Sequence, residues 1–345
     1  MKKKNIINLI KYYSEHNDAG FKSEAYEIAK GFDSSGDYQL AEYIMALMSE
    51  ANTFVPQMVE SNSDFLEKMN TNEQPLLLPD VIMKDILGVV NAISHNIGIN
   101  KYLFQGPPGT GKTEAVRQLA KILKRDAFLV DFSMIVDSKL GQTQKNITSL
   151  FKEINSLSYP EHVIILFDEI DALALDRTSS NDLREMGRAT TAILKGLDYL
   201  DDRVVVVATT NLYKYFDKAL VRRFDSVIDF NRYSQNDLVD IAEMYLNDLL
   251  NKFKLANKDI RLFRKIIKLM SPIPYPGDLK NMIKTAVAFS DPSDGSDYFR
   301  RLYNTVSPET SIEIPILQKR GFTLREIEIL TGVSKSKVAR ELKES

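Results

Sequence analysis

The residues with the clearest chemical potential form a glycine-rich loop that fits the pattern G-x-x-x-x-G-K-[ST] at every position. The loop consists of Gly106, Pro107, Pro108, Gly109, Thr110, Gly111, Lys112 and Thr113. The apolar segment 102–104 precedes it, and apolar residues at helical spacing follow over 114–123. Glycines let the backbone curl so that its N–H groups point at a phosphate chain, and the helix N-terminus adds a positive dipole. We therefore predict that the loop binds the phosphates of ATP, that Lys112 contacts the β- and γ-phosphates, and that Thr113 binds Mg²⁺.

Two carboxylates follow an apolar segment later in the chain. Residues 164–167 are all apolar, and Asp168 and Glu169 come directly after them. Carboxylates at the C-terminal end of a buried strand emerge in the crevice where open α/β sheets bind ligands. We therefore expect Asp168 to complete the Mg²⁺ site and Glu169 to polarise an attacking water.

Further polar candidates follow the next apolar segments. Asn211 comes shortly after residues 204–208, where a neutral amide could hold the attacking water or contact the γ-phosphate. Arg222 and Arg223 precede another apolar segment, 226–228. Such a pair is often a solvated turn, but an arginine can also project into a neighbouring subunit and offset the charge that develops during phosphoryl transfer.

The elements that must position these groups alternate as in an α/β domain. Besides the segment before the loop, we predict buried strands at 128–130, 163–167, 204–208 and 226–228, with helices between the first three. This pattern predicts a parallel sheet covered by helices over residues 80–231. Apolar stripes at helical spacing then predict helices over residues 232–290.

The N-terminal part has a different composition. Residues 1–50 are predicted to form a bundle of three helices, which either packs on the rest of the protein or offers a docking surface for an adaptor. Residues 51–79 are rich in Asn, Ser and Pro and are predicted to be a linker.

The C-terminal tail, residues 291–345, contains a second pattern of interest. Thr323 can cap one helix, residues 331–333 make a turn, and Ser334 can cap a second helix. The segment resembles the helix-turn-helix of resolvases and transcription regulators. DNA contact through residues 320–343 and protein docking are both open, and the first would use Lys335, Lys337, Arg340 and Lys343.

Composition limits the remaining classes of function. The 345 residues are 44% hydrophobic and 27% charged, which suits a packed soluble protein of two or three domains. There is no cysteine, which excludes disulfides and thiol nucleophiles, and three scattered histidines argue against a histidine metal site. The net charge of −2 does not predict nucleic-acid binding by the chain as a whole. Since no signal peptide or membrane-spanning run is evident, we expect a cytoplasmic protein.

Taken together, the motifs resemble those of the AAA ATPases, the ring-forming remodelling family of the AAA+ superfamily. The sequences GPPGTGKT, DEIDA, ATTN and ALVRRFD occur in the family's order, within residues 80–290. The resemblance implies a P-loop NTPase fold with a helical lid, Mg²⁺-dependent ATP hydrolysis, and a homo-oligomeric ring, usually a hexamer. It also implies that Asn211 is a polar sensor, and that Arg222 and Arg223 act on the ATP of the adjacent subunit. Residues 181–188 match the segment that faces the next subunit in the family.

Two positions depart from the family pattern. Many members carry an aromatic residue in a pore loop that grips a polypeptide, but Lys139 takes that place here. Threading of a polypeptide is therefore not predicted, and a basic pore would suit an acidic chain or nucleic acid. Some members carry a second sensor arginine near the glycine that matches Gly277. In this chain the cation nearest to that position is Lys280, which is either an exposed helix lysine or a sensor.

Three hypotheses of function follow. In the first, the ATPase remodels a protein partner, and a looser resemblance points to bacterial ATPases encoded beside a subtilisin-like protease in phage-defence loci. In the second, it is a DNA-associated regulator or loader that uses its tail. In the third, it is a scaffold whose assembly is gated by nucleotide.

Overall fold

A computed structural model describes most of the chain. The described residues are 3–15, 17–35, 37–48, 63, 65–71, 77–130, 132–135, 142–157, 159–171, 180–215, 217–253, 257–307 and 312–344. The predicted pore-loop position, Lys139, lies outside them. The chain divides into two compact units, residues 1–64 and 65–345, and each is described by itself.

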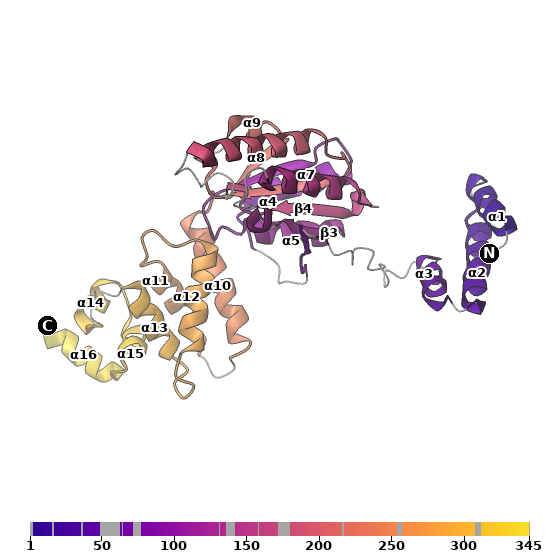
Figure 1. Ribbon diagram of the computed structural model, residues 1–345. Coiled ribbons are helices and arrows are strands. Elements are labelled where there is room, and N and C mark those ends of the chain that lie inside the picture. The colour runs from indigo at the N-terminus through magenta and orange to yellow at the C-terminus, as the bar shows by residue number, and fades with distance from the viewer. Residues whose placement is uncertain are drawn as a thin grey trace. The chain divides into compact units, whose positions relative to one another are not determined.

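The first unit contains three helices, α1 (Lys3–Ser14), α2 (Asp18–Ser34) and α3 (Tyr38–Met48) (Figure 1). Helix α2 packs against both of the others. Asn17 caps α2 by accepting a hydrogen bond from the Gly20 N–H, as expected for an Asn at this position. Along α1, Ile7, Ile10 and Tyr13 are exposed.

The second unit is built on a six-stranded sheet of order β1-β3-β4-β5-β2-β6. Strand β1 is antiparallel to β3, and the other neighbouring strands are parallel. The strands are β1 (Leu66–Lys68), β2 (Lys101–Gln105), β3 (Asp126–Val130), β4 (Val163–Phe167), β5 (Val205–Thr210) and β6 (Ser226–Asp229). The fold is therefore α/β, and the five parallel strands lie at the positions that the apolar segments predict.

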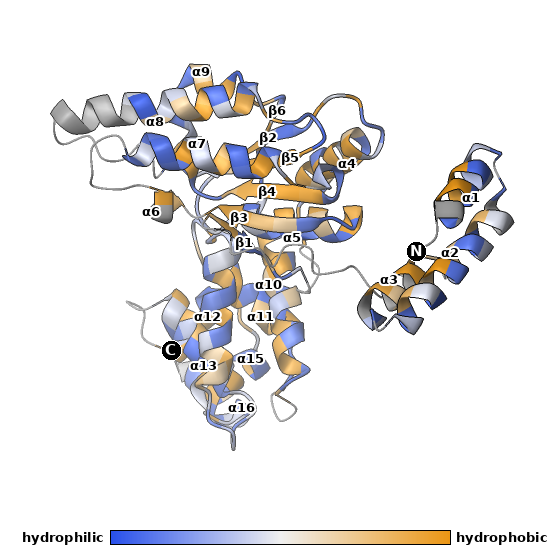
Figure 2. Cartoon of the chain, turned by 45° about the vertical axis from the view of Figure 1, so that its right-hand side comes forward, coloured by the Kyte–Doolittle hydropathy of each residue, from blue (hydrophilic) through white to orange (hydrophobic). Residues whose placement is uncertain are grey.

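Helices cover both faces of this sheet, which is why its inner strand β4 is apolar and buried at all five positions. Figure 2 shows α7 and α8 on one side and α5 on the other. On the first side Phe151 of α7 packs edge-on against Phe167 of β4, with ring centroids 5.8 Å apart. On the second, Leu119 of α5 and Ile86 of α4 share a core with Tyr102 of β2. The helices and 3₁₀ turns of this part are α4 (Asp80–Ser94), α5 (Lys112–Leu123), α6 (Phe132–Ile135), α7 (Gln142–Asn155), η1 (Pro160–His162), α8 (Ser180–Asp198), η3 (Tyr213–Tyr215) and α9 (Lys218–Val221).

The rest of the second unit is helical. It comprises α10 (Gln235–Leu250), α11 (Ile260–Ile267), α12 (Pro276–Ala288), α13 (Asp297–Val306), α14 (Ile314–Lys319), α15 (Leu324–Thr331) and α16 (Lys335–Glu344). A single hydrophobic core runs through it, from Leu238 on α10 through Phe299 on α13 to Val338 on α16. In the part of the chain that the structure describes, the predicted lid and the predicted tail therefore form one packed body with a shared core.

The segment predicted to be a linker, 51–79, contains ordered structure. Strand β1 lies within it and pairs with β3, where Leu66 is opposite Val130. Three residues with one buried side chain carry no periodicity, so the sequence pattern does not reveal this edge strand. Among the described helices, none combines the length and the apolar character needed to cross a membrane.

Candidate nucleotide-binding site

The predicted site residues meet at one edge of the sheet. The glycine-rich loop follows β2, Asp168 and Glu169 follow β4, and Asn211 follows β5. Because β5 lies between β4 and β2 and all three strands are parallel, their C-terminal ends are adjacent. This is the edge at which open α/β sheets bind ligands.

The backbone of the loop takes conformations that favour glycine. Gly106, Gly109 and Gly111 have φ values of 148°, 76° and 89°. The Gly106 N–H donates to the Thr210 carbonyl oxygen over 3.2 Å, which anchors the start of the loop to β5. Helix α5 begins at Lys112, and its N-cap, Gly111, provides no side-chain cap. The loop therefore presents a helix N-terminus that suits an anion.

Lys112 lies at the centre of the site. Its side chain is buried, and its Nζ atom donates to the carbonyl oxygens of Gly106 (2.7 Å) and Pro107 (2.9 Å) and to Asn211 Oδ1 (2.7 Å). Burial lowers the pKa of Lys112, and the nearby carboxylates of Asp168, Asp171 and Glu169 oppose this shift. Three acceptors of the chain itself thus bind the Lys112 ammonium group at the place where we predict phosphate binding.

The predicted metal ligands lie side by side. Thr113 Oγ1 is 3.0 Å from Asp168 Oδ1 and 3.1 Å from its Oδ2, and Thr209 Oγ1 donates to Asp168 Oδ1 over 2.6 Å. Hydroxyl and carboxylate oxygens are the hard donors that Mg²⁺ prefers, and Mg²⁺ usually completes its shell with water and substrate phosphates. The donor set therefore fits Mg²⁺, with Thr113 and Asp168 as its holders.

Glu169 has a strained backbone with φ of 48°, which is uncommon for a residue other than glycine. Its N–H donates to Thr209 Oγ1 over 2.9 Å, and its Oε1 accepts a hydrogen bond from Asn211 Nδ2 over 3.2 Å. Asn211 therefore contacts both Lys112 and Glu169. Next to them Asp171 is buried, and its Oδ1 has no hydrogen-bond partner within the described chain.

The lid holds the loop through its backbone. The Gly277 N–H donates to the Gly109 carbonyl oxygen over 2.8 Å, and the Tyr233 hydroxyl donates to the Thr110 carbonyl oxygen over 2.7 Å. Burial raises the pKa of Tyr233, so that its hydroxyl stays protonated as a donor. Arg232, at the start of the lid, forms an ion pair with Asp85 of α4. The lid is thus tied to both the loop and the α/β subdomain.

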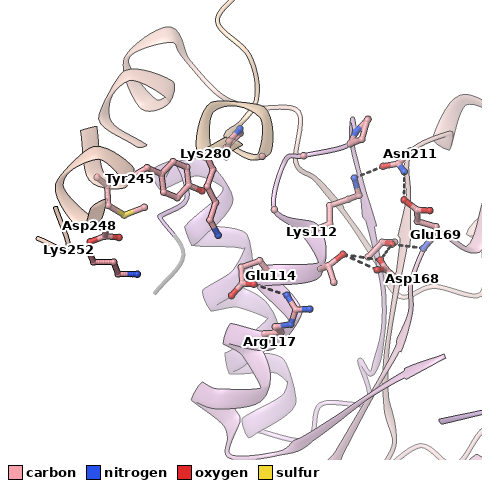
Figure 3. Close-up of a pocket in the computed structure, with 18 residues that line it drawn as sticks. Lys112, Glu114, Arg117, Asp168, Glu169, Asn211, Tyr245, Asp248, Lys252 and Lys280 are labelled. Atoms are coloured by element: carbon pink, nitrogen blue, oxygen red, sulfur yellow. Dashed lines mark hydrogen bonds and ion pairs between the residues drawn. The ribbon is translucent and has the colours of Figure 1, made fainter. Parts of the chain in front are cut away.

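A cavity of about 640 Å³ connects these parts. Figure 3 shows Lys112, Asp168, Glu169 and Asn211 close together. The lid residues that line the cavity, which include Tyr245 and Lys280, lie on the other side of α5. On the lid side Lys280 Nζ lies 5.9 Å from the centre of the Tyr245 ring. Gly109 and Gly111 of the loop, Lys112 and Thr113 line the cavity, and so does Lys280.

The arginine pair lies outside this cavity, and its two members differ. Arg223 is held by Asp198 at the end of α8, with Nε 3.1 Å from Oδ1, and its Nη1 donates to the Ala219 carbonyl oxygen. Arg222 is exposed, and within the described part of the chain its side chain has no hydrogen-bond or ion-pair partner. Neither arginine contacts the site of its own chain, as the hypothesis of action on a neighbouring subunit requires.

Several residues of the site were not singled out from the sequence. Thr209 lies inside the quoted ATTN motif, and its position directly after the apolar segment 204–208 was the available signal. Tyr233 and Gly277 lie in the lid, and their contacts with the loop depend on tertiary packing. Tyr245 belongs to an apolar stripe of α10, which does not distinguish a core tyrosine from one that lines a cavity.

The sheet order, the glycine loop, the strand-end carboxylates and the helical lid define a P-loop nucleotide-binding protein. More particularly, residues 102–232 match the model of the ATPase family associated with various cellular activities (AAA). This segment, which contains the loop, both carboxylates, Asn211 and the arginine pair, has the motifs of an AAA ATPase domain.

Individual relatives agree with this assignment. The chain is 31% identical over 183 residues to y4kL, an uncharacterised AAA family ATPase of Sinorhizobium fredii; the match covers 50% of this chain and 54% of y4kL. It is 30% identical over 237 residues to a proteasome-activating nucleotidase of Methanococcus maripaludis, covering 61% of this chain and 56% of the nucleotidase. Among solved structures, the FIGL-1 AAA domain in complex with ADP shares the fold, with a TM-score of 0.53, 20% identity, and 75% of this chain and 92% of that chain covered. The chain thus spans about half the length of these two curated relatives.

Proposed function

We propose that the protein is a cytoplasmic, Mg²⁺-dependent ATPase that hydrolyses ATP to ADP and phosphate and uses the reaction to remodel a protein partner. The observation that carries the proposal is the convergence of Lys112, the Thr113–Asp168 pair and Glu169 at one edge of the sheet. A phosphate-binding cation, hard metal ligands and a carboxylate near a polar amide are the groups that phosphoryl transfer to water requires.

The cavity has an orientation that suits ATP. The phosphates fit the loop, where backbone N–H groups and the N-terminus of α5 attract anions. From there the cavity extends to Met244, Tyr245 and Asp248 on α10. An aromatic ring and an apolar side chain suit the base, so we place adenine against α10 of the lid.

Each residue then has a distinct task. Lys112 would exchange its backbone acceptors for the β- and γ-phosphate oxygens, and Thr113 and Asp168 would hold Mg²⁺, whose charge offsets that of the phosphates. Glu169 would accept a proton from the attacking water, while Asn211 keeps its carboxylate in place through the 3.2 Å hydrogen bond.

We further propose a homo-oligomeric ring, most simply a hexamer, because Arg222 is exposed and does not line the cavity of its own chain, so that it can serve a neighbour's. The protein partner is supported by similarity to a relative named as a nucleotidase that activates the proteasome. The narrower hypothesis of a subtilisin-like protease in phage defence remains to be tested. Purification of an ATP-locked Glu169→Gln chain from its native cell would test it, because the trapped partner can be identified directly.

The activity itself is tested by comparing Lys112→Ala with Lys121→Ala. Both lysines lie on α5, but Lys121 is exposed and outside the cavity. The wild type and Lys121→Ala should bind a fluorescent ATP analogue and release phosphate, whereas Lys112→Ala should lose nucleotide binding. Equal binding by the two variants would refute the site.

A nucleotide-gated scaffold makes a different prediction from the same site. In that case ATP would drive ring formation in analytical ultracentrifugation while phosphate release stays near the uncatalysed rate. Sustained turnover by the wild type excludes it.

A further inference from the structure

The last helix, α16, presents a row of cations that the ATPase site does not use. Lys335, Lys337, Arg340 and Lys343 are all exposed. Among the described residues, none of the four side chains forms an ion pair or a hydrogen bond. Since lone exposed cations gain nothing from the fold itself, this row is available to an anionic partner.

The opposite side of α16 is fixed to the protein. Val338 is fully buried, and Leu342 packs against the same core. On the helical wheel, Arg340 and Lys343 fall opposite Val338, and Lys337 lies beside them, so these three cations share the outward side of the helix, whereas Lys335 falls near Leu342. The helix therefore has one apolar side that is packed and one basic side that is free.

Local contacts set the orientation of α16 relative to α15. Thr323 and Glu326 form a capping box at the start of α15, and Gly332 ends that helix with φ of 73°. The side chain of Glu328 then accepts a hydrogen bond from the Lys335 N–H over 3.0 Å, which caps α16. The three-residue connection between the helices is thus held at both ends, as in a helix-turn-helix.

This helix pair is also anchored to the lid. Lys265 of α11 lies 2.6 Å from Glu326, whose side chain is only 6% exposed, and Arg300 of α13 donates to the Ile329 carbonyl oxygen over 3.2 Å. Figure 1 shows α14, α15 and α16 gathered beside α11 and α13. The cations of α16 therefore belong to the same helical body as Tyr245 and Lys280, which line the nucleotide cavity.

We propose that the basic side of α16 binds duplex DNA, with the helix in the major groove and its cations on the flanking phosphates. The major groove admits one α-helix, and a rigidly held second helix with exposed basic residues is the arrangement that enters it. Ser334 and Ser336, at the start of α16, add hydroxyls that can contact phosphates or base edges. The net charge of −2 of the whole chain does not oppose this, because the positive charge is local.

The test uses the full chain and a fluorescently labelled DNA duplex of roughly three helical turns. Fluorescence anisotropy is measured from about 50 to 200 mM salt for the wild type and for the triple variant Lys337→Glu, Arg340→Glu, Lys343→Glu. The matched control is Lys84→Glu, Lys121→Glu, Lys152→Glu. These lysines are exposed on α4, α5 and α7, and their side chains have no ion-pair partner among the described residues. The substitution changes the net charge by the same amount.

We expect the wild type and the control to bind the duplex with strong salt dependence. The α16 variant should bind at least tenfold more weakly, and the slope of log affinity against log salt should fall by about 2.7 for three lost phosphate contacts. ATP hydrolysis without DNA should be the same in all three proteins, since α16 does not line the cavity. The proposal is overturned if the wild type does not bind the duplex, if the α16 variant binds as well as the control, or if polyglutamate displaces the duplex as effectively as unlabelled DNA does.

Discussion

The amide of Asn211 lies between Lys112 and Glu169, with its Oδ1 2.7 Å from Lys112 Nζ and its Nδ2 3.2 Å from Glu169 Oε1. The Asn211 side chain thus connects Lys112, the proposed phosphate ligand, to Glu169, the proposed general base. The orientation of the amide is fixed by its two partners, because a lysine only donates and a carboxylate only accepts. Nucleotide that draws Lys112 away from Asn211 would leave the amide with its hydrogen bond to Glu169, which keeps the carboxylate in place.

Replacement of Glu169 by glutamine separates binding from hydrolysis. Glutamine keeps the shape and an Oε1 acceptor for Asn211, but it cannot take a proton from water. We expect Glu169→Gln to bind ATP as tightly as the wild type and to hydrolyse it about 10²- to 10⁴-fold more slowly. Isothermal titration gives the affinity and phosphate release gives the rate. Turnover within a few-fold of the wild type would exclude Glu169 as the general base.

The two adjacent arginines should differ in function. The Arg222 side chain is exposed and has no partner among the residues that the structure describes, whereas Arg223 is held by Asp198. If Arg222 completes the site of a neighbouring subunit, Arg222→Ala should lower kcat by about 10³-fold without changing ATP affinity. Arg223→Ala removes a partly exposed ion pair worth less than about 1 kcal/mol of stability, and it should reduce kcat much less.

A mixing experiment separates this role from damage within one subunit. Neither Arg222→Ala nor Glu169→Gln should hydrolyse ATP alone. In mixed oligomers an intact Glu169 can face an intact Arg222 from the other chain, so part of the activity should return. If the mixed oligomers hydrolyse ATP no faster than the two variants alone, action between subunits would be contradicted. Equal losses of kcat from the two arginine substitutions would contradict it as well.

The sequence was informative where function and local structure coincide. The loop from Gly106 to Thr113 and the carboxylates after β4 were recognisable because each motif combines a required residue order with its flanking strand or helix. The buried parallel strands were predictable from continuous apolar runs. In contrast, β1 was not, because it is a short edge strand whose place is set by pairing with β3.

Other features depend on contacts between distant segments. The different environments of Arg222 and Arg223 arise only when α8 brings Asp198 beside one of them. Likewise, the union of lid and tail results from a core shared by Leu238, Phe299 and Val338, and helical stripes do not say what they pack against. The sequence therefore indicated the helices but not that they form one body.

The close approach of the lid to the loop depends on two glycines. A Cβ atom on Gly277 would lie 2.9 Å from the Cα atom of Gly109, which has φ of 76° and belongs to the loop backbone. Gly277→Ala should therefore push the lid away and lengthen the 2.8 Å hydrogen bond to the Gly109 carbonyl oxygen. We expect ATP affinity to fall by about two- to tenfold, which corresponds to the net value of one hydrogen bond.

Gly88→Ala is the matched control for this change. Gly88 lies within α4, and a Cβ atom there meets nothing within 4 Å. Its ATP affinity should stay unchanged, and stability should rise by up to about 1 kcal/mol because alanine favours the helix. Equal nucleotide affinities for the two variants in titration calorimetry would show that the lid can yield at this point.

The contact between lid and tail should respond to acid. Burial by itself would raise the pKa of Glu326, but hydrogen bonds from Lys265 and from the Thr323 N–H outweigh it, so the pKa lies below the usual 4.5. The folded state then binds fewer protons than the unfolded state near that pH. The contribution to stability is present above about pH 4.5 and is lost as the pH falls through the lower pKa of the folded state.

Glu326→Gln should consequently lower the stability of the helical body at pH 7 by about 1 to 3 kcal/mol, and its deficit should shrink as the pH falls below 4.5. Urea denaturation followed by circular dichroism at several pH values measures both effects. Glu67→Gln, at an exposed position of β1, is the control and should follow the wild-type pH profile. A deficit for Glu326→Gln that stays constant from neutral pH into acid would mean that the ionised carboxylate does not hold the tail on the lid.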